Sequence, residues 1–152
     1  MEDLVLIIVQ EDVERRYIAA VLAADGFDLI QVPSVVEGMV QTMAHDPALI
    51  IIAEETSPVR LDEVIALIRR LTAAPVMIVG SGGEGDELAS LRGGGDYYLA
   101  RPFRGTELAA RARALIQRSS AGRRETASRE DRPVVFAGRC APRRASGGTQ
   151  AA

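Results

Sequence analysis

The run LIII at residues 49–52 decides the fold of this chain. Four aliphatic residues in succession are too few for a core helix and too apolar for a strand with one face in water. Such a run is typical of a strand covered on both faces, as at the centre of a parallel sheet. Function in an open parallel α/β sheet lies at the carboxyl ends of the strands. We therefore expect the site around Ala53, Glu54 and Glu55, which follow the run directly.

Apolar runs alternate with helical patterns along the rest of the chain. The other predicted strands are residues 4–9, 27–32, 75–79 and 96–99, and the predicted helices are residues 13–25, 34–45, 61–71, 87–91 and 105–118. This alternation predicts an α/β fold, a five-stranded doubly wound parallel sheet flanked by five helices. The most apolar strands, at 4–9, 49–52 and 75–79, should occupy its middle.

Cap residues and periodicity predict how two of the helices begin, end and pack. Asp12 is expected to cap the helix at 13–25 and Gly26 to end it, while Ser34 is expected to cap the helix at 34–45. The inward face of that second helix should carry four apolar side chains, Val36, Met39, Val40 and Met43.

Composition divides the chain into a domain at residues 1–118 and a basic, Arg-, Ser- and Gly-rich tail at 119–152, which we expect to be disordered. The N-terminus has no basic region before its first apolar run, no run is long enough to span a membrane, and Cys140 is the single cysteine. These features favour the cytoplasm. The single histidine, His45, disfavours a histidine-built metal site or catalytic triad, so we expect no catalytic residues and no enzyme activity.

Four features at the predicted functional edge bear on its chemistry. Glu11 and Asp12 are either a weak divalent-cation pocket or a helix cap. The glycine-rich loop at residues 80–86 lacks the order of a phosphate-binding loop, which favours a mobile loop. The first strand–helix turn, QEDVE, has no glycine and so does not match a dinucleotide fingerprint. The Arg101–Pro102 bond can be cis or trans.

Two segments near the end of the predicted domain resemble a known family. PVMIVGSGGEGDELASLRGGGDYYLARPF (75–103) and ELAARARALIQR (107–118) are similar to the receiver domain of bacterial two-component response regulators, in particular the OmpR/PhoB-like group. The resemblance covers residues 4–118 and implies a CheY-like fold, related to flavodoxin. It also implies a place in transcription regulation by phosphorelay, in which a histidine kinase passes a phosphoryl group to an aspartate with the help of Mg²⁺.

Carried over to this sequence, the family's acceptor and metal positions are altered. The phosphoacceptor aspartate corresponds to Ala53, whose methyl group cannot accept phosphate. The paired metal-holding acids correspond to Gln10 and Glu11, so one member is neutral. We therefore expect Mg²⁺ binding to be absent, or weakened and confined to Glu11 and Asp12.

The positions that contact phosphate and change conformation in the family are partly kept. The hydroxyl residue that ends the fourth strand corresponds to Gly80, although Ser81 is adjacent. The lysine corresponds to Arg101, which keeps the charge but has a planar head. The switch aromatic is kept as Tyr98. These departures together predict a degenerate pseudo-receiver.

Three functions follow from these observations. The first is an unphosphorylated receiver-like module that acts through protein–protein contacts. The second is a phosphoacceptor receiver with a displaced site, in which Glu54 or Glu55 accepts the phosphoryl group. The third is a flavodoxin-like binder of a nucleotide or other small molecule, using the loop at 80–86 and Arg101.

The family also suggests the partners. The resemblance implies a protein partner or a homodimer through the fourth helix, fifth strand and fifth helix, but Glu87 would then face Glu107 and Arg92 would face Arg113. Residues 133–138, PVVFAG, resemble the opening strand of a DNA-binding domain, and nothing after them can complete one. Sequence-specific DNA binding by this chain alone and membrane binding are therefore not expected. A natural stand-alone receiver and a truncated transcription factor both fit.

Overall fold

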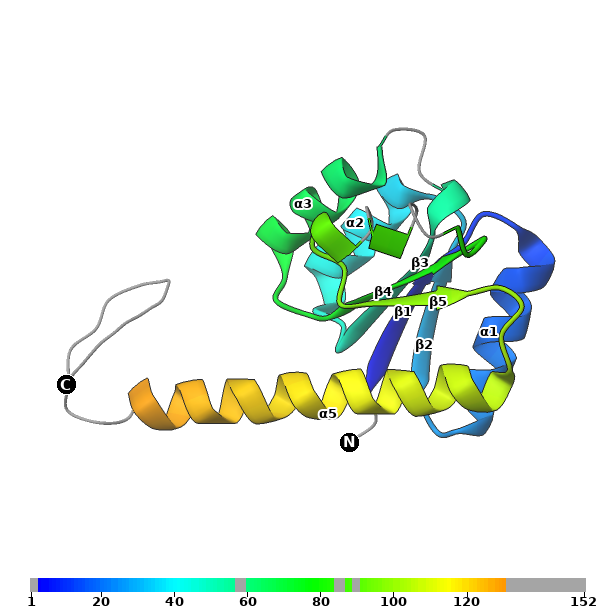
Figure 1. The fold of residues 1–152 in the computed structure, drawn as a ribbon. Coiled ribbons are helices and arrows are strands. Elements are labelled where there is room, and N and C mark those ends of the chain that lie inside the picture. Colours follow the sequence, from blue (N-terminus) through cyan, green and yellow to red (C-terminus); the bar gives the residue numbers. More distant parts are fainter. Residues whose placement is uncertain (1–2, 57–59, 84–86, 89–90, 131–152) are drawn as a thin grey trace. The chain divides into compact units, whose positions relative to one another are not determined.

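Five parallel strands form one sheet in the order β2-β1-β3-β4-β5 in the computed structural model (Figure 1). The structure describes residues 3–56, 60–83, 87–88 and 91–130. The strands are β1 (Leu4–Ile8), β2 (Asp28–Val32), β3 (Leu49–Ala53), β4 (Val76–Gly80) and β5 (Tyr97–Ala100). The helices are α1 (Asp12–Ala24), α2 (Val35–His45), the 3-10 helix η1 (Glu54–Thr56), α3 (Leu61–Leu71) and α5 (Gly105–Glu130).

The predicted sheet is confirmed, with β1, β3 and β4 in its middle. Every residue of β3 and β4 is buried, as expected for strands covered on both faces. The predicted helix at residues 87–91 falls partly outside the described residues, although 87–88 and 91–92 are helical. None of the helices in the described part of the chain has the length and apolarity to cross a bilayer.

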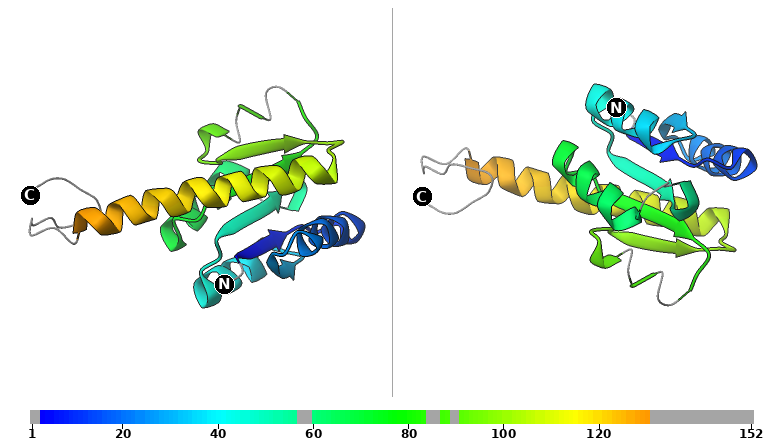
Figure 2. Two further views of the ribbon diagram at one scale, coloured as in Figure 1. Left: turned by 90° about the horizontal axis from the view of Figure 1, so that it is seen from below. Right: turned by 90° about the horizontal axis from the view of Figure 1, so that it is seen from above.

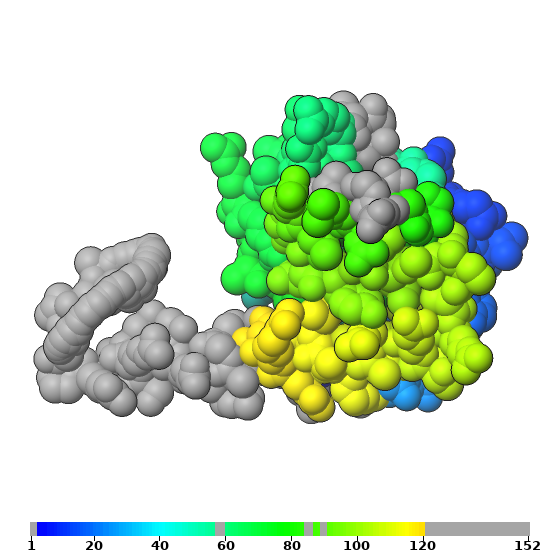
Figure 3. Space-filling model, in the orientation of Figure 1, coloured from blue at the N-terminus to red at the C-terminus, as the bar shows by residue number. Residues whose placement is uncertain are grey.

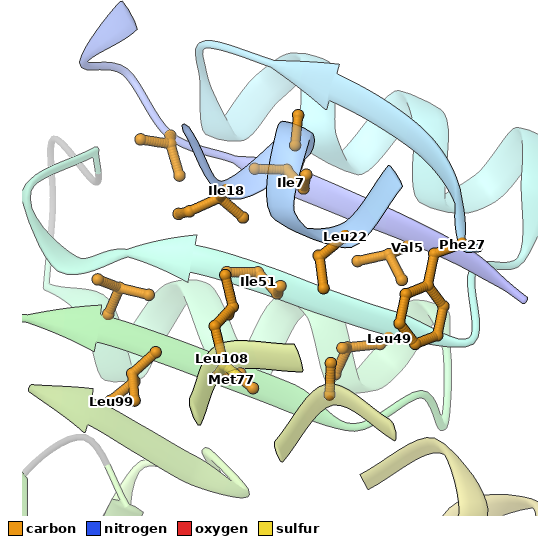
Figure 4. Close-up of a cluster of buried hydrophobic side chains, with 14 of the residues drawn as sticks. Val5, Ile7, Ile18, Leu22, Phe27, Leu49, Ile51, Met77, Leu99 and Leu108 are labelled. Carbon is orange, nitrogen blue, oxygen red and sulfur yellow. The ribbon is translucent and has the colours of Figure 1, made fainter. Parts of the chain in front are cut away.

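Side chains of the strands alternate between two hydrophobic layers. One layer, drawn in Figure 4, lies between the sheet and the helices α1 and α5, and it includes Ile7, Ile51 and Ala53. The other lies between the sheet and α2 and α3, and it includes Ile8 and Tyr98. The two views of Figure 2 show these helix pairs on opposite faces of the sheet. Because neighbouring residues of a strand point to opposite faces, the ends of the strands present different side chains to the two layers.

The inward face of α2 differs from the prediction. Val36, Val40 and Met43 are exposed by 73%, 52% and 64%, whereas Met39 is partly buried. The buried face is instead formed by Val35, Gly38 and Thr42. Gly38 lies against β1, where an added Cβ would stand 2.5 Å from Ile8 Cδ1. The Thr42 hydroxyl donates to the Gly38 carbonyl at 2.8 Å, so its burial leaves the hydroxyl hydrogen-bonded.

Two helix ends also need correction. The N-cap of α1 is Glu11, and Asp12, the predicted cap, is the first helical residue. Gly26, with a φ of 95°, follows the helix as predicted, and Ser34 caps α2 as predicted. Helix α5 continues to Glu130, beyond its predicted end at residue 118, because the residues after its apolar stripe include good helix formers. Contacts divide the chain into Met1–Ile116 and Gln117–Ala152. Of the tail at 119–152, which was predicted to be disordered, residues 119–130 belong to α5, and residues 131–152 lie outside the described part.

Candidate functional site

An open cleft of about 640 Å³ lies at the carboxyl edge of the sheet, where β1 and β3 end. It is lined by Val9, Gln10, Glu11, Glu14, Ala53, Glu55, Thr56 and Arg101. The cleft therefore brings together five of the residues predicted from the sequence, which are Gln10, Glu11, Ala53, Glu55 and Arg101. Ala53 contributes only a methyl group, and it is 2% exposed.

Glu11 and Asp12, the candidate cation ligands, are both engaged in local structure. The Glu11 carboxylate accepts the amide hydrogens of Val13 at 3.1 Å and Glu14 at 2.7 Å, which satisfies free donors of the first turn of α1. Asp12 forms ion pairs with Arg15 and, at 3.1 Å, with Arg16. The geometry thus supports the helix-cap interpretation, with Glu11 as the capping residue.

Arg101 is held from two sides by carboxylates. Its Nε and NH2 donate to Glu14 at 2.6 and 2.9 Å, and its NH1 and NH2 donate to Glu55 at 2.6 and 2.7 Å. The hydrogen bonds from Arg101 lower the pKa of Glu55, and those to Glu55 and Glu14 raise the pKa of Arg101 further above its ordinary value. An anion entering the cleft would therefore have to compete with two bidentate partners for this guanidinium.

Two more contacts fix the cleft and were not predicted. The backbone amide of Gln10 donates to the Thr56 hydroxyl at 3.0 Å, which ties the end of β1 to η1. Arg15 NH1 donates to the carbonyl of Val9 at 3.0 Å. Arg15 lies in the first turns of α1 and Thr56 lies in η1, and the direction of a side chain there depends on turn geometry rather than on a residue pattern.

Glu54 turns away from the cleft toward a second group of residues. Its Oε2 accepts the amide of Ser81 at 2.9 Å and lies 3.3 Å from the Ser81 hydroxyl and 3.4 Å from the Tyr98 hydroxyl. The Tyr98 hydroxyl in turn accepts the amide of Gly82 at 3.0 Å. Gly80 lies directly beside this group. The predicted positions Gly80, Ser81 and Tyr98 are therefore brought together, but around Glu54 and not around Ala53.

The carboxylates near the cleft do not fit a magnesium site. Within the described ranges, no group of three or more histidine, cysteine, aspartate or glutamate side chains can hold a metal ion. Glu11 caps a helix, Glu14 and Glu55 hold Arg101, and Gln10 and Ala53 offer no charge. Hard cations need several free oxygen ligands, which these residues do not supply together.

The remaining sequence-derived features are placed as follows. The Arg101–Pro102 bond is cis, one of the two isomers left open by the sequence. Residues 84–86 of the glycine-rich loop lie outside the described residues. β5 and the start of α5 lie together on the face shown in Figure 3. Arg111 of α5 lies over the ring of Tyr97 of β5, at 4.9 Å from its centroid. Arg113, predicted to face Arg92 in a dimer, bonds within the chain to the Asp25 carbonyl at 3.1 Å.

Comparison with proteins of known sequence finds transcriptional regulators. No family model matches the chain. It is 32% identical over 118 residues to the KDP operon transcriptional regulatory protein KdpE of Escherichia coli (strain K12), covering 77% of this chain and 52% of KdpE. It is 28% identical over 117 residues to the transcriptional regulatory protein CpxR homolog of Haemophilus influenzae, covering 76% and 51%. The chain spans about half the length of the curated relatives it matches.

Solved structures share the fold. A response regulator receiver domain protein (CheY-like) from Methanospirillum hungatei JF-1 superposes with a TM-score of 0.74 at 14% identity, covering 80% of this chain and 99% of that one. A two-component response regulator from Clostridium difficile gives a TM-score of 0.72 at 21% identity, covering 77% and 98%. The sheet order and these superpositions show the CheY-like fold.

Proposed function

We propose that the chain is a response-regulator receiver module of the OmpR-like type that works without being phosphorylated, through contacts with another protein. One observation carries this proposal: the residue that ends β3 at the floor of the cleft is Ala53. A methyl group has no oxygen with which to attack a phosphoryl donor.

The surroundings of Ala53 support the same proposal. Phosphoryl transfer depends on cations that neutralise the phosphoryl oxygens. Here the cleft's guanidinium, that of Arg101, is engaged by Glu14 and Glu55, and the position of one metal-holding acid is the neutral Gln10. The nucleophile, the metal ligands and the free cation that phosphoryl transfer requires are thus all altered in this cleft.

The geometry favours neither displaced acceptor. Glu54 is hydrogen-bonded to Ser81 and is not among the residues that line the cleft, and Glu55 forms a bidentate pair with Arg101. A small-molecule binder of the flavodoxin type has no further support in the described residues. The cytoplasmic location and the partner surface of the fourth helix, fifth strand and fifth helix stay predictions, as does the lack of DNA binding by this chain alone.

Incubation with acetyl phosphate and Mg²⁺, followed by intact-mass measurement at neutral pH, tests the proposal. We expect no gain of one phosphoryl group by the parent protein. An authentic receiver domain with its acceptor aspartate, treated in parallel, must gain one for the assay to count. A phosphoryl adduct on the parent would overturn the proposal, and its loss in Glu54→Gln or in Glu55→Gln would identify a displaced acceptor.

A further inference from the structure

We propose that the Glu54 carboxylate holds Tyr98 in its buried position by hydrogen bonding. The ends of β4 and β5 then keep one arrangement without phosphorylation of the chain. This deepens the proposed function and rests on it, because an unmodified module needs an internal group to set its conformation. The Glu54 oxygen that would do this lies next to groups from both strands.

The first support is the set of strand ends that Glu54 connects. Glu54 directly follows β3, Ser81 directly follows β4, and Tyr98 lies within β5. One oxygen, Oε2, accepts from the Ser81 amide and lies within hydrogen-bond distance of the Tyr98 hydroxyl. Hydrogen bonds to an ionised acceptor are stronger than neutral ones. Glu54 therefore links three adjacent strands at the functional edge through a single charged group.

The second support is the room that Gly80 leaves. Gly80 does not have a positive φ, so its backbone conformation is open to any residue. Its missing side chain matters instead, because an added Cβ would stand 2.2 Å from the Tyr98 hydroxyl and 2.5 Å from Glu54 Cδ. Glu54 and Tyr98 together fill the volume that a side chain at position 80 would occupy. The three residues therefore fit one another as a set.

The third support is the position of Tyr98 and of the loop that follows β4. Tyr98 is 6% exposed and packs in the layer next to α2 and α3. Its hydroxyl accepts the Gly82 amide at 3.0 Å, which connects the tyrosine ring to the start of the loop. Anchoring this hydroxyl beside Glu54 thus sets both the ring of Tyr98 and the backbone of Ser81 and Gly82.

Amide hydrogen exchange by NMR tests the proposal in the full chain. In Glu54→Ala we expect the Ser81 and Gly82 amides to exchange about tenfold faster or more, since each loses a hydrogen bond or its anchor. Tyr98→Phe should release the Gly82 amide alone, and Glu54→Gln, whose amide oxygen still accepts, should give intermediate protection of Ser81. Tyr98 ring signals should shift in Glu54→Ala.

The matched control is Glu55→Gln, which neutralises the neighbouring carboxylate and should leave Ser81, Gly82 and Tyr98 as in the parent. Unchanged amides of β3 and β4 show that each variant is folded, and Glu54→Gln serves if Glu54→Ala does not fold. Parent-like exchange of Gly82 and parent-like Tyr98 signals in both Glu54 variants would overturn the inference. The proposed function is tested separately, because a phosphorylated protein would show a phosphoryl adduct in the mass spectrum.

Discussion

Arg101 and Glu14 form a bidentate ion pair that joins the residue after β5 to the first turn of α1, with Nε–Oε2 at 2.6 Å and NH2–Oε1 at 2.9 Å. The same guanidinium also binds Glu55, but the two carboxylates differ in exposure, since the Glu14 side chain is 16% exposed and that of Glu55 is 55% exposed. Solvent screens the second pair far more than the first.

Neutralising Glu14 should therefore cost more stability than neutralising Glu55. We expect Glu14→Gln to lower the free energy of unfolding by about 1.5–3 kcal/mol, the range for hydrogen bonds to charged groups. Glu55→Gln should lower it by no more than about 1 kcal/mol. Urea unfolding of the two variants measures both values. Equal losses, or a larger loss in Glu55→Gln, would contradict the greater contribution of the less exposed Arg101–Glu14 pair.

The lowered pKa of Glu55 predicts a pH dependence. Because Arg101 stabilises the ionised form in the folded state, the pKa of Glu55 is lower there than the ordinary value of 4.5. Its contribution is complete above the ordinary pKa and is lost as the pH falls through the folded-state pKa. The difference in unfolding free energy between the parent and Glu55→Gln should thus be largest near neutrality and shrink on acidification. A difference that is the same in urea titrations at neutral and acidic pH would argue against this ion pair.

Gly80→Ala tests the volume shared with Glu54 and Tyr98. The new methyl group would overlap both side chains, so we expect a loss of about 1–3 kcal/mol, the usual cost of overpacking. In a Glu54→Ala background the overlap with the carboxylate is removed and the overlap with the Tyr98 hydroxyl remains, so the same change should cost less. A double-mutant cycle in urea measures this coupling. Additive losses would show that the two positions do not share space.

The fold was predictable from the sequence because long apolar strands leave little choice of position in a parallel sheet. The helix surfaces were harder, as α2 shows: Val36, Val40 and Met43 have helical spacing, yet Gly38 and Thr42 form the buried face. A prediction from periodicity relies on large apolar residues, whereas a helix that packs closely on a strand needs a small residue at the point of contact.

The candidate site was predictable by position and not by contact. Residues after the strands were expected at one edge, and Ala53, Gln10, Glu11 and Arg101 meet there. The sequence does not show which carboxylate each donor selects, because that choice depends on the turn at η1 and on the first turn of α1. Glu54 lies in η1, and its carboxylate contacts Ser81 rather than the residues that line the cleft.

The packing of α2 gives a further prediction. Gly38→Ala should destabilise the protein by about 1–2 kcal/mol although alanine favours helices, because its methyl group meets Ile8 in a buried layer. Met43→Gln, on the exposed face, should change stability by less than about 0.5 kcal/mol. Thermal or urea unfolding compares them. A larger effect of Met43→Gln than of Gly38→Ala would place the inward face where the periodicity suggested.

Restoring a carboxylate at the floor of the cleft tests the altered site directly. Ala53→Asp would introduce a charge at a buried position near Glu11, Glu14 and Glu55. Nearby carboxylates disfavour one another's ionised forms, so we expect a loss of stability without metal. The new oxygen atoms also complete a better ligand set for a hard cation. Millimolar Mg²⁺ should therefore recover stability, by about 1.4 kcal/mol at ten times its dissociation constant.

Urea titrations of the parent, of Ala53→Asp and of Gln10→Asp/Ala53→Asp, each with and without Mg²⁺, measure this response. The parent should respond little, because the oxygens of Glu11, Glu14 and Glu55 are already engaged by helix amides and by Arg101. The double variant should respond more than Ala53→Asp, since it adds a second acid at the end of β1. Ca²⁺, which accepts longer and more flexible coordination, distinguishes a shaped site from general charge screening, and NaCl at matched ionic strength controls for screening itself. Equal Mg²⁺ shifts in the parent and in Ala53→Asp would mean that Ala53 does not occupy the vacated ligand position.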